Sequence, residues 1–175
     1  QMLPDGASVL DVGAGDGRVA RLVMDRRPDL TIRGVDVMAR SVSQIAVEVF
    51  DGRTLPFPDR AFDAAMMVDV LHHAADPERL FAEMVRVVKH TIVIKDHLVR
   101  GVLSQVTLSF MDWVGNARYG VALPYAYWTP ARWRQAYAAH RLRVAEQRDS
   151  LGLYPWPASL VFERQLHFIA RLERD

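Results

Sequence analysis

The hydrophobic positions of the first hundred residues fall into short apolar runs that alternate with amphipathic segments. Residues 7–12 form a β-branched apolar run that ends in glycines, which is typical of a buried strand followed by a tight turn. Residues 18–26 follow, with Val19, Leu22 and Val23 at helical spacing. Further apolar runs predict strands over residues 30–35, 46–50, 62–70 and 91–95.

A helix is predicted between the last two of these strands. Asp76 has the side chain of an N-cap, and Pro77 suits the first helical position. The positions that would face the core are Leu80, Phe81, Met84, Val85 and Val88. Strands that alternate with helices indicate parallel strands joined by right-handed crossovers, so we expect an open α/β sheet with helices on both faces.

The C-terminal part of the chain has a different pattern. It predicts helices over residues 102–114 and 129–139, and strands over residues 142–147 and 164–170. Two late strands without a long helix between them would form a hairpin that finishes the sheet. No repeat or linker composition interrupts the sequence, so we expect a single domain over residues 1–175.

Two further expectations concern the segments that cover the site. Residues 98–162 contain the connections that can rise over the substrate side of the sheet. The first strand begins about six residues after Gln1, so a segment that covers the sheet edge and the site is expected to lie outside this sequence.

Composition narrows the class of protein. The chain has 175 residues, of which 50% are hydrophobic and 25% charged, which suits one globular domain. There is no cysteine, so disulfides and thiolate chemistry are excluded, and a reducing cytoplasmic location is consistent. The formal charge of +1 gives no large positive field that would attract a phosphate backbone, so no nucleic-acid partner is expected. Charged residues interrupt every apolar stretch, so no membrane span is expected, and the oligomeric state is unknown.

An acidic residue stands at the predicted carboxyl end of all five early strands: Asp11, Asp36, Asp51, Asp69 and Asp96. In open α/β sheets this edge binds the ligand. After the first strand, glycines at positions 13, 15 and 17 permit a tight turn and a close approach of the main chain to a ligand. An acid after the second strand can accept both hydroxyls of a ribose, which indicates an adenosine cofactor.

The glycine loop distinguishes between adenosine cofactors. A dinucleotide-binding loop needs a third glycine where this chain has Arg18. Asp11 and Asp16 would also repel a pyrophosphate at the start of the helix. S-adenosylmethionine has no phosphate and carries a positive sulfonium and a positive amino group, which nearby carboxylates attract. It is therefore the favoured cofactor.

Four motifs in order resemble the class I S-adenosylmethionine-dependent methyltransferases. They are VLDVGAGDG at residues 9–17, GVD at 34–36, DGRTLPF at 51–57, and FD at 62–63 leading to VLHH at 70–73. The sequence is similar in particular to the small-molecule group with a type 11 domain, which includes the ubiquinone and menaquinone C-methyltransferases. The resemblance implies a Rossmann-like fold with a mostly parallel seven-stranded sheet, helices on both faces and a C-terminal antiparallel hairpin.

The same resemblance implies which residues bind the cofactor. Its methionyl part would contact the main chain of the turn at Gly13, Ala14 and Gly15, with Asp11 ordering that turn. Asp36 would hold the ribose hydroxyls.

For the adenine, the resemblance implies Val37 against the ring, Asp51 accepting from the amino group, and Gly52 offering its main chain. Val68 or Asp69 would pass beside the cofactor. One departure concerns residues 37–45, which are too few for the usual crossover helix, so we expect this second crossover to be shortened.

His72, His73 and His97 are the candidate catalytic residues. A neutral imidazole can take a proton from an acceptor, and these residues follow the fourth and fifth strands. The alternative is that they cap or pack beneath a loop. No metal is expected, because adjacent histidines on an extended chain point in different directions and no i, i+4 pair is present.

Aromatic residues and prolines gather in residues 110–128 and 151–157. They would either pack in the core or form a wall of the substrate site. In the second interpretation the substrate residues are Trp113, Tyr125, Tyr127 and Trp128, and the substrate is a small apolar or aromatic molecule.

The sequence thus predicts methyl transfer from S-adenosylmethionine to such a molecule. Two other hypotheses stay open: a non-catalytic module with the same fold, and a dinucleotide-dependent oxidoreductase.

Overall fold

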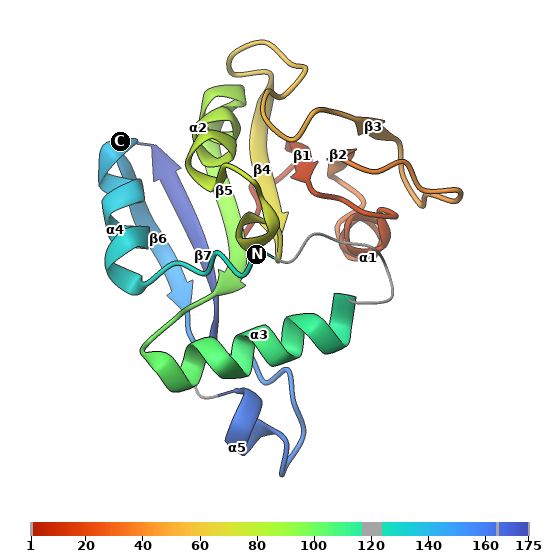
Figure 1. The fold of residues 1–175 in the computed structure, drawn as a ribbon. Helices are drawn as coiled ribbons and strands as arrows, with labels where there is room; N and C mark the ends of the chain where they lie inside the picture. Colours follow the sequence, from red (N-terminus) through yellow and green to blue (C-terminus); the bar gives the residue numbers. More distant parts are fainter. Residues whose placement is uncertain (1, 117–123, 164, 175) are drawn as a thin grey trace.

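A computed structural model of the chain describes residues 2–116, 124–163 and 165–174. Its centre is one seven-stranded sheet in the order β3-β2-β1-β4-β5-β7-β6 (Figure 1). The strands are β1 (Ser8–Val12), β2 (Thr31–Asp36), β3 (Val47–Val49), β4 (Phe62–Val68), β5 (Val88–His97), β6 (Leu142–Arg148) and β7 (His167–Arg174). The first five pair in parallel, whereas β7 pairs antiparallel with both β5 and β6. The expected parallel sheet with a C-terminal hairpin is confirmed.

Helices cover both faces of this sheet. They are α1 (Arg18–Arg26), the 3-10 helix η1 (Leu71–His73), α2 (Pro77–Val87), α3 (Val102–Asn116), α4 (Pro130–Ala139) and α5 (Ser159–Phe162). Asp76 caps α2 by accepting a hydrogen bond from the main-chain N–H of Arg79, and Thr129 caps α4 in the same way through Arg132. Both helices begin with a proline at the first position, as the sequence predicts.

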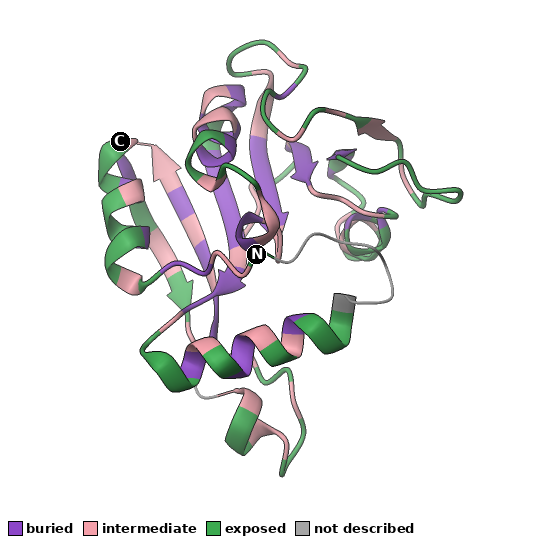
Figure 2. Ribbon diagram, in the orientation of Figure 1, coloured by how far each residue is buried: buried purple, intermediate pink, exposed green. Residues whose placement is uncertain are grey.

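The core is divided between the two faces of the sheet. On one face, α2 and α4 pack side chains such as Phe81 and Trp133 against β4, β5 and β7. On the other, Ala20 of α1 joins a smaller cluster with Val9 and Ile32. Figure 2 shows buried residues along the central strands and exposed residues on the outward sides of α1 and α4. The sheet is therefore packed on both faces, and its carboxyl edge is left for the loops that follow the strands.

Several element boundaries differ from those expected. Val88 begins β5 rather than ending the apolar stripe of α2, and the last strand begins at His167 rather than at residue 164, which lies outside the described residues. The short helix α5 was not expected. Residues 37–46, all of them described, contain no helix, which confirms the shortened second crossover.

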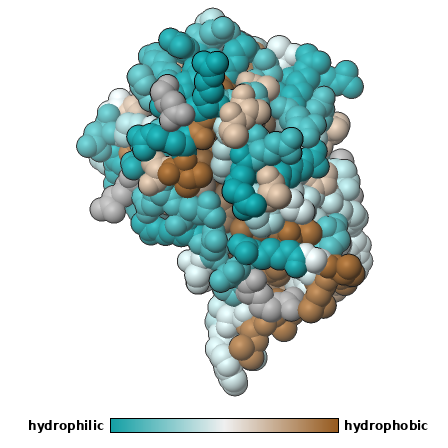
Figure 3. Space-filling view, turned by 90° about the vertical axis from the view of Figure 1, so that its left-hand side faces the viewer, coloured by the Kyte–Doolittle hydropathy of each residue, from teal (hydrophilic) through white to brown (hydrophobic). Residues whose placement is uncertain are grey.

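α3 lies across the carboxyl ends of β4 and β5 (Figure 1). Leu108 of α3 packs with Tyr127 and Leu166 in a third small cluster. Other apolar side chains of α3 are exposed, namely Val102, Leu103, Val106, Phe110, Trp113 and Val114. Apolar atoms gather at the lower end of the molecule in Figure 3, the end where α3 and α5 lie in Figure 1. Within the described chain, every helix is too short or too polar to cross a lipid bilayer.

Candidate functional site

The glycine turn after β1 is held by main-chain contacts with β2. The N–H groups of Gly13 and Ala14 both donate to the carbonyl oxygen of Val35, at 2.8 and 3.0 Å. Gly13 has φ of 77°, and a Cβ built on it would lie 2.3 Å from Cγ2 of Val70. Only glycine fits this position, because a side chain would face both a strained backbone and a steric clash.

Asp36 links this turn to the loop that follows β2. One carboxylate oxygen accepts from the N–H of Gly15 at 2.8 Å, and the other accepts from the N–H of Met38 at 2.9 Å. A carboxylate has about four lone-pair sites, so both oxygens can still accept from a ligand. Asp36 is thus oriented in advance at the end of β2.

A cavity of about 410 Å³ opens where these turns meet. Eight of the ten expected cofactor residues line it: Gly13, Gly15, Asp36, Val37, Asp51, Gly52, Val68 and Asp69. Residues that the sequence reasoning missed also line it: Met38, Arg40, Phe50, Arg53, Val70, Ala74, Ala75 and Leu80. The volume is within the range of about 300–1,000 Å³ that is typical of small-molecule sites.

Asp51 acts as a turn residue after β3. Its Oδ1 accepts from the N–H groups of Arg53 and Thr54, both at 2.8 Å. Those hydrogen bonds lower the pKa of the Asp51 carboxyl. Because Oδ2 is not used in these bonds, the turn leaves one oxygen for the cavity that Asp51 lines.

Asp11 and Ala14, the other two expected cofactor residues, are not part of the cavity lining. Asp11 is only 3% exposed, and burial together with the negative charge of Asp36 raises its pKa to about 7. Ala14 packs close to Gly34, on which a Cβ would lie 2.7 Å from the Ala14 methyl. Both residues therefore pack beneath the turn, away from the cavity.

Asp69 lines the cavity and has a φ of 56°. Its two carboxylate oxygens bind Nζ of Lys95 at 2.6 and 2.5 Å. This ion pair ties the end of β4 to β5 and holds Asp69 beside the cavity.

The three candidate histidines converge, but they occupy different environments. His73 is half-buried and lines the cavity, whereas His72 and His97 are buried behind it. The rings of His72 and His73 have centroids 4.1 Å apart, and those of His72 and His97 are 4.5 Å apart. The expectation that the adjacent pair would point apart on an extended chain is wrong, because the chain forms a 3-10 turn there and the two rings lie against each other at an interplanar angle of 48°.

His72 is held between two carboxylates. Its Nδ1 lies 2.6 Å from Oδ1 of Asp96, and its Nε2 lies 3.5 Å from Oδ2 of Asp112 on α3. Burial lowers the pKa of His72, but Asp96 and Asp112 outweigh this effect and raise it to about 10. At neutral pH His72 is therefore protonated and positively charged, so its imidazole cannot accept a further proton.

Of the four aromatic candidates, Tyr125 and Tyr127 lie together, with ring centroids 6.4 Å apart, whereas Trp113 and Trp128 lie elsewhere. Trp113 is 57% exposed on the outer side of α3, and Tyr125 is half-buried. Tyr127 is buried, and its hydroxyl donates a short hydrogen bond to Asp112. The stretch from residue 110 to 128 in which these residues fall includes residues 117–123, which lie outside the described residues.

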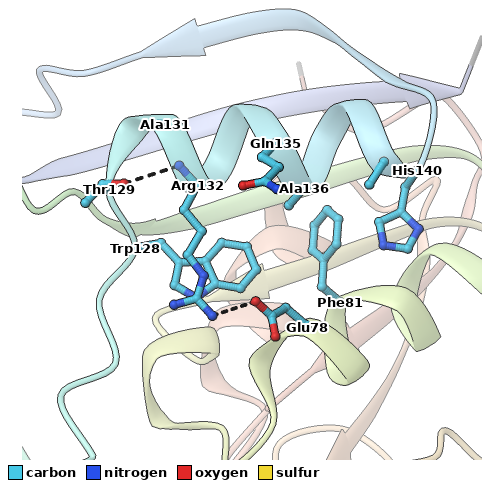
Figure 4. Close-up of a pocket in the computed structure, with 10 residues that line it drawn as sticks. Glu78, Phe81, Trp128, Thr129, Ala131, Arg132, Gln135, Ala136 and His140 are labelled. Carbon is cyan, nitrogen blue, oxygen red and sulfur yellow. Dashed lines mark hydrogen bonds and ion pairs between the residues drawn. The ribbon is translucent and has the colours of Figure 1, made fainter.

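Trp128 lines a different cavity, of about 460 Å³, between α2 and α4 (Figure 4). The guanidinium of Arg132 lies 4.8 Å from the centre of its ring and binds Glu78 at 2.6 Å. This cavity shares no lining residue with the one at the glycine turn. Trp128 is therefore placed as a core residue rather than beside the expected cofactor.

Comparison with known proteins gives consistent results. Residues 10–92 match the methyltransferase domain family. Ajmaline N-methyltransferase of Rauvolfia serpentina is 30% identical over 108 residues, which are 53% of this chain and 37% of that protein. Demethylmenaquinone methyltransferase of Thermotoga maritima is 34% identical over 88 residues, which are 46% of this chain and 38% of that protein. The alignments with these curated relatives thus span under two fifths of their length.

Among solved structures, a putative methyltransferase from Haloferax volcanii, in complex with a methyltransferase activator, has the same fold. It superposes with a TM-score of 0.73 at 20% identity, over 98% of this chain and 84% of that one.

Proposed function

Because this chain carries a class I S-adenosylmethionine-dependent methyltransferase domain, we propose that the protein transfers the methyl group of S-adenosylmethionine to a small organic molecule. The observation that carries the proposal is the cavity of about 410 Å³ in which the glycine turn, Asp36 and Asp51 meet. These residues come from the ends of three adjacent strands, where an open α/β sheet binds its ligand.

The cofactor would be held along this cavity. We assign the ribose hydroxyls to Asp36, whose oxygens are already oriented by Gly15 and Met38. The adenine amino group would donate to Oδ2 of Asp51, with the ring against the apolar side chains of Val37, Phe50 and Leu80. The N–H groups of the turn and the nearby carboxylates would receive the methionyl part and its positive sulfonium.

The chemistry would need alignment more than a specialised catalytic group. The sulfonium is an activated methyl donor, so the protein accelerates an in-line displacement by orienting the acceptor and excluding water. Of the three candidate histidines, His73 is the one that lines the cavity, with His72 and His97 behind it. We propose that the three histidines contact a methyl acceptor whose attacking group loses a proton during the transfer.

We assign a small, apolar or aromatic acceptor. Two of the matched relatives are named for such acceptors, ajmaline and demethylmenaquinone, whereas others are named for phosphatidylethanolamine and for a tRNA. We assign the aromatic contacts of the acceptor first to Tyr127, whose ring centroid lies 5.4 Å from that of His72, and to Tyr125, whose ring centroid lies 6.4 Å from that of Tyr127. Trp113 would contribute only if its exposed face is covered, and Trp128 is not part of the assignment.

Calorimetry with the purified protein tests the proposal. We expect S-adenosylmethionine and its demethylated product to bind one per chain, with NAD giving no heat above dilution. Asp36→Ala removes both acceptors for the ribose and should weaken binding by at least tenfold. Asp25→Ala on the outer side of α1 is the matched control and should bind as the wild type does.

Tight binding of NAD without binding of S-adenosylmethionine would refute the proposal and favour an oxidoreductase. Cofactor binding without transfer to any acceptor would favour the non-catalytic module.

A further inference from the structure

His72, His73 and Asp112 bring three potential metal-ligand atoms together beside the cofactor cavity. One ring nitrogen or carboxylate oxygen from each residue lies within 4.8 Å of the others. His72 and Asp112 are 2% and 6% exposed, whereas His73 is half-buried and lines the cavity. The cluster is therefore shielded from bulk water on one side and open to the proposed methyl donor on the other.

The orientation of His72 is that of a metal ligand. Its Nδ1 is held by Asp96 at 2.6 Å, and metal-binding histidines commonly have their second nitrogen fixed by a carboxylate in this way. Its Nε2 is buried and has no hydrogen-bond partner among the described residues. The nearest acidic oxygen, Oδ2 of Asp112, is 3.5 Å away.

The spacing of these two atoms fits a shared cation. Bonds of about 2.0–2.2 Å in a tetrahedral site place neighbouring ligand atoms roughly 3.3–3.6 Å apart. The separation of 3.5 Å between Nε2 and Oδ2 falls in this range. Tyr127 also donates a hydrogen bond to the Asp112 carboxylate, which fixes the second ligand as Asp96 fixes the first.

Charge points the same way. Asp96 and Asp112 place two buried carboxylates around His72, and the single positive charge of the protonated imidazole balances only one of them. The ammonium group of Lys95 on β5 is engaged by Asp69 through both carboxylate oxygens. A divalent ion that takes the place of the proton on Nε2 of His72 would balance both carboxylates.

We propose that His72, His73 and Asp112 bind one divalent transition-metal ion, with Zn²⁺ or Mn²⁺ as the probes, and that this ion holds an oxygen of the methyl acceptor. The proposal rests on the proposed function and narrows its substrate to molecules with a hydroxyl or enol group. A metal-bound hydroxyl loses its proton to solvent at neutral pH. Its oxygen then attacks the methyl carbon, so that the O–C bond forms as the S–C bond breaks and S-adenosylhomocysteine leaves.

Metal titration of chelator-treated protein tests this site without any acceptor. We expect one Zn²⁺ per chain by calorimetry, and Co²⁺ should give visible absorption typical of nitrogen and oxygen ligands. His73→Ala and Asp112→Asn should each weaken Zn²⁺ binding by at least tenfold, and Asp96→Asn by about 10 to 100-fold. His90→Ala and Asp25→Asn, at exposed positions on β5 and α1, are the matched controls and should bind Zn²⁺ as the wild type does.

Asp112→Asn keeps the shape of the side chain, so it preserves a test even if variants of the buried His72 fail to fold. Absence of stoichiometric Zn²⁺ binding, or equal affinity in wild type, His73→Ala and Asp112→Asn, would overturn the metal site. S-adenosylmethionine is titrated into the same metal-free samples. Cofactor binding without metal binding would refute the metal site alone, whereas loss of cofactor binding in the wild type would refute the proposed function.

Discussion

Asp11 offers a quantitative test of how the glycine turn is built. It is 3% exposed at the end of β1, and burial with the charge of Asp36 raises its pKa from 3.8 to about 7. The folded state thus favours the protonated form. The resulting stability is complete below pH 3.8 and is lost as the pH rises through 7.

The size of the effect follows from the pKa values. Because the pKa is raised by about three units, the free energy of unfolding is lower by about 4 kcal/mol above pH 7 than below pH 3.8. Between pH 5 and pH 8 the wild type should lose about 2 to 3 kcal/mol through Asp11 alone. Asp11→Asn removes the ionisation and should lack this part of the pH dependence.

Urea unfolding of both proteins at pH 5, 6, 7 and 8 measures the difference directly. We expect the stability of Asp11→Asn relative to the wild type to rise by about 2 to 3 kcal/mol across this range. Asp25→Asn, whose carboxylate lies exposed on α1, controls for the loss of one surface charge. A constant difference between Asp11→Asn and wild type at all four pH values would refute the reasoning.

Two further predictions concern the turn and the helix that frame the cavity. Gly13→Ala should abolish binding of S-adenosylmethionine by calorimetry, because the new methyl would lie 2.3 Å from Cγ2 of Val70; Gly6→Ala, which meets no atom within 4 Å, should leave binding intact. Equal binding by both variants would contradict the close approach. Asp76→Ala removes the side chain that accepts from the N–H of Arg79 and should lower the free energy of unfolding by about 1 kcal/mol. Asp76→Asn should retain most of it, and an equal loss in both variants in urea unfolding would argue against the cap.

Much of the fold follows from local pattern. Short apolar runs predict the central strands β1, β4 and β5, since a strand buried between two helical layers is apolar on both sides, whereas the edge strand β6 is largely exposed. Asp76 with Pro77 and Thr129 with Pro130 mark the starts of α2 and α4 to the residue, because capping depends on neighbours three positions away. The small number of residues after Asp36 likewise predicts the missing crossover helix.

The cofactor cavity is predictable for a related reason. The carboxyl ends of parallel strands meet at one edge of the sheet, so Gly13, Asp36 and Asp51 could be placed together before their geometry was known. The apolar lining from Met38 and Phe50 was missed, because apolar side chains in loops carry no periodic signal, and Leu80 of α2 was expected in the core rather than at the cavity.

Long-range packing decided the rest. Nothing near Asp112 in the sequence indicates that α3 would bring its carboxylate to Nε2 of His72, and nothing near Trp128 indicates that it would pack between α2 and α4. The pKa values of Asp11 and His72 depend on burial and on charges contributed by distant segments. Sequence periodicity reports whether a side chain is buried, whereas the partner that it meets is determined only when the helices settle against the sheet.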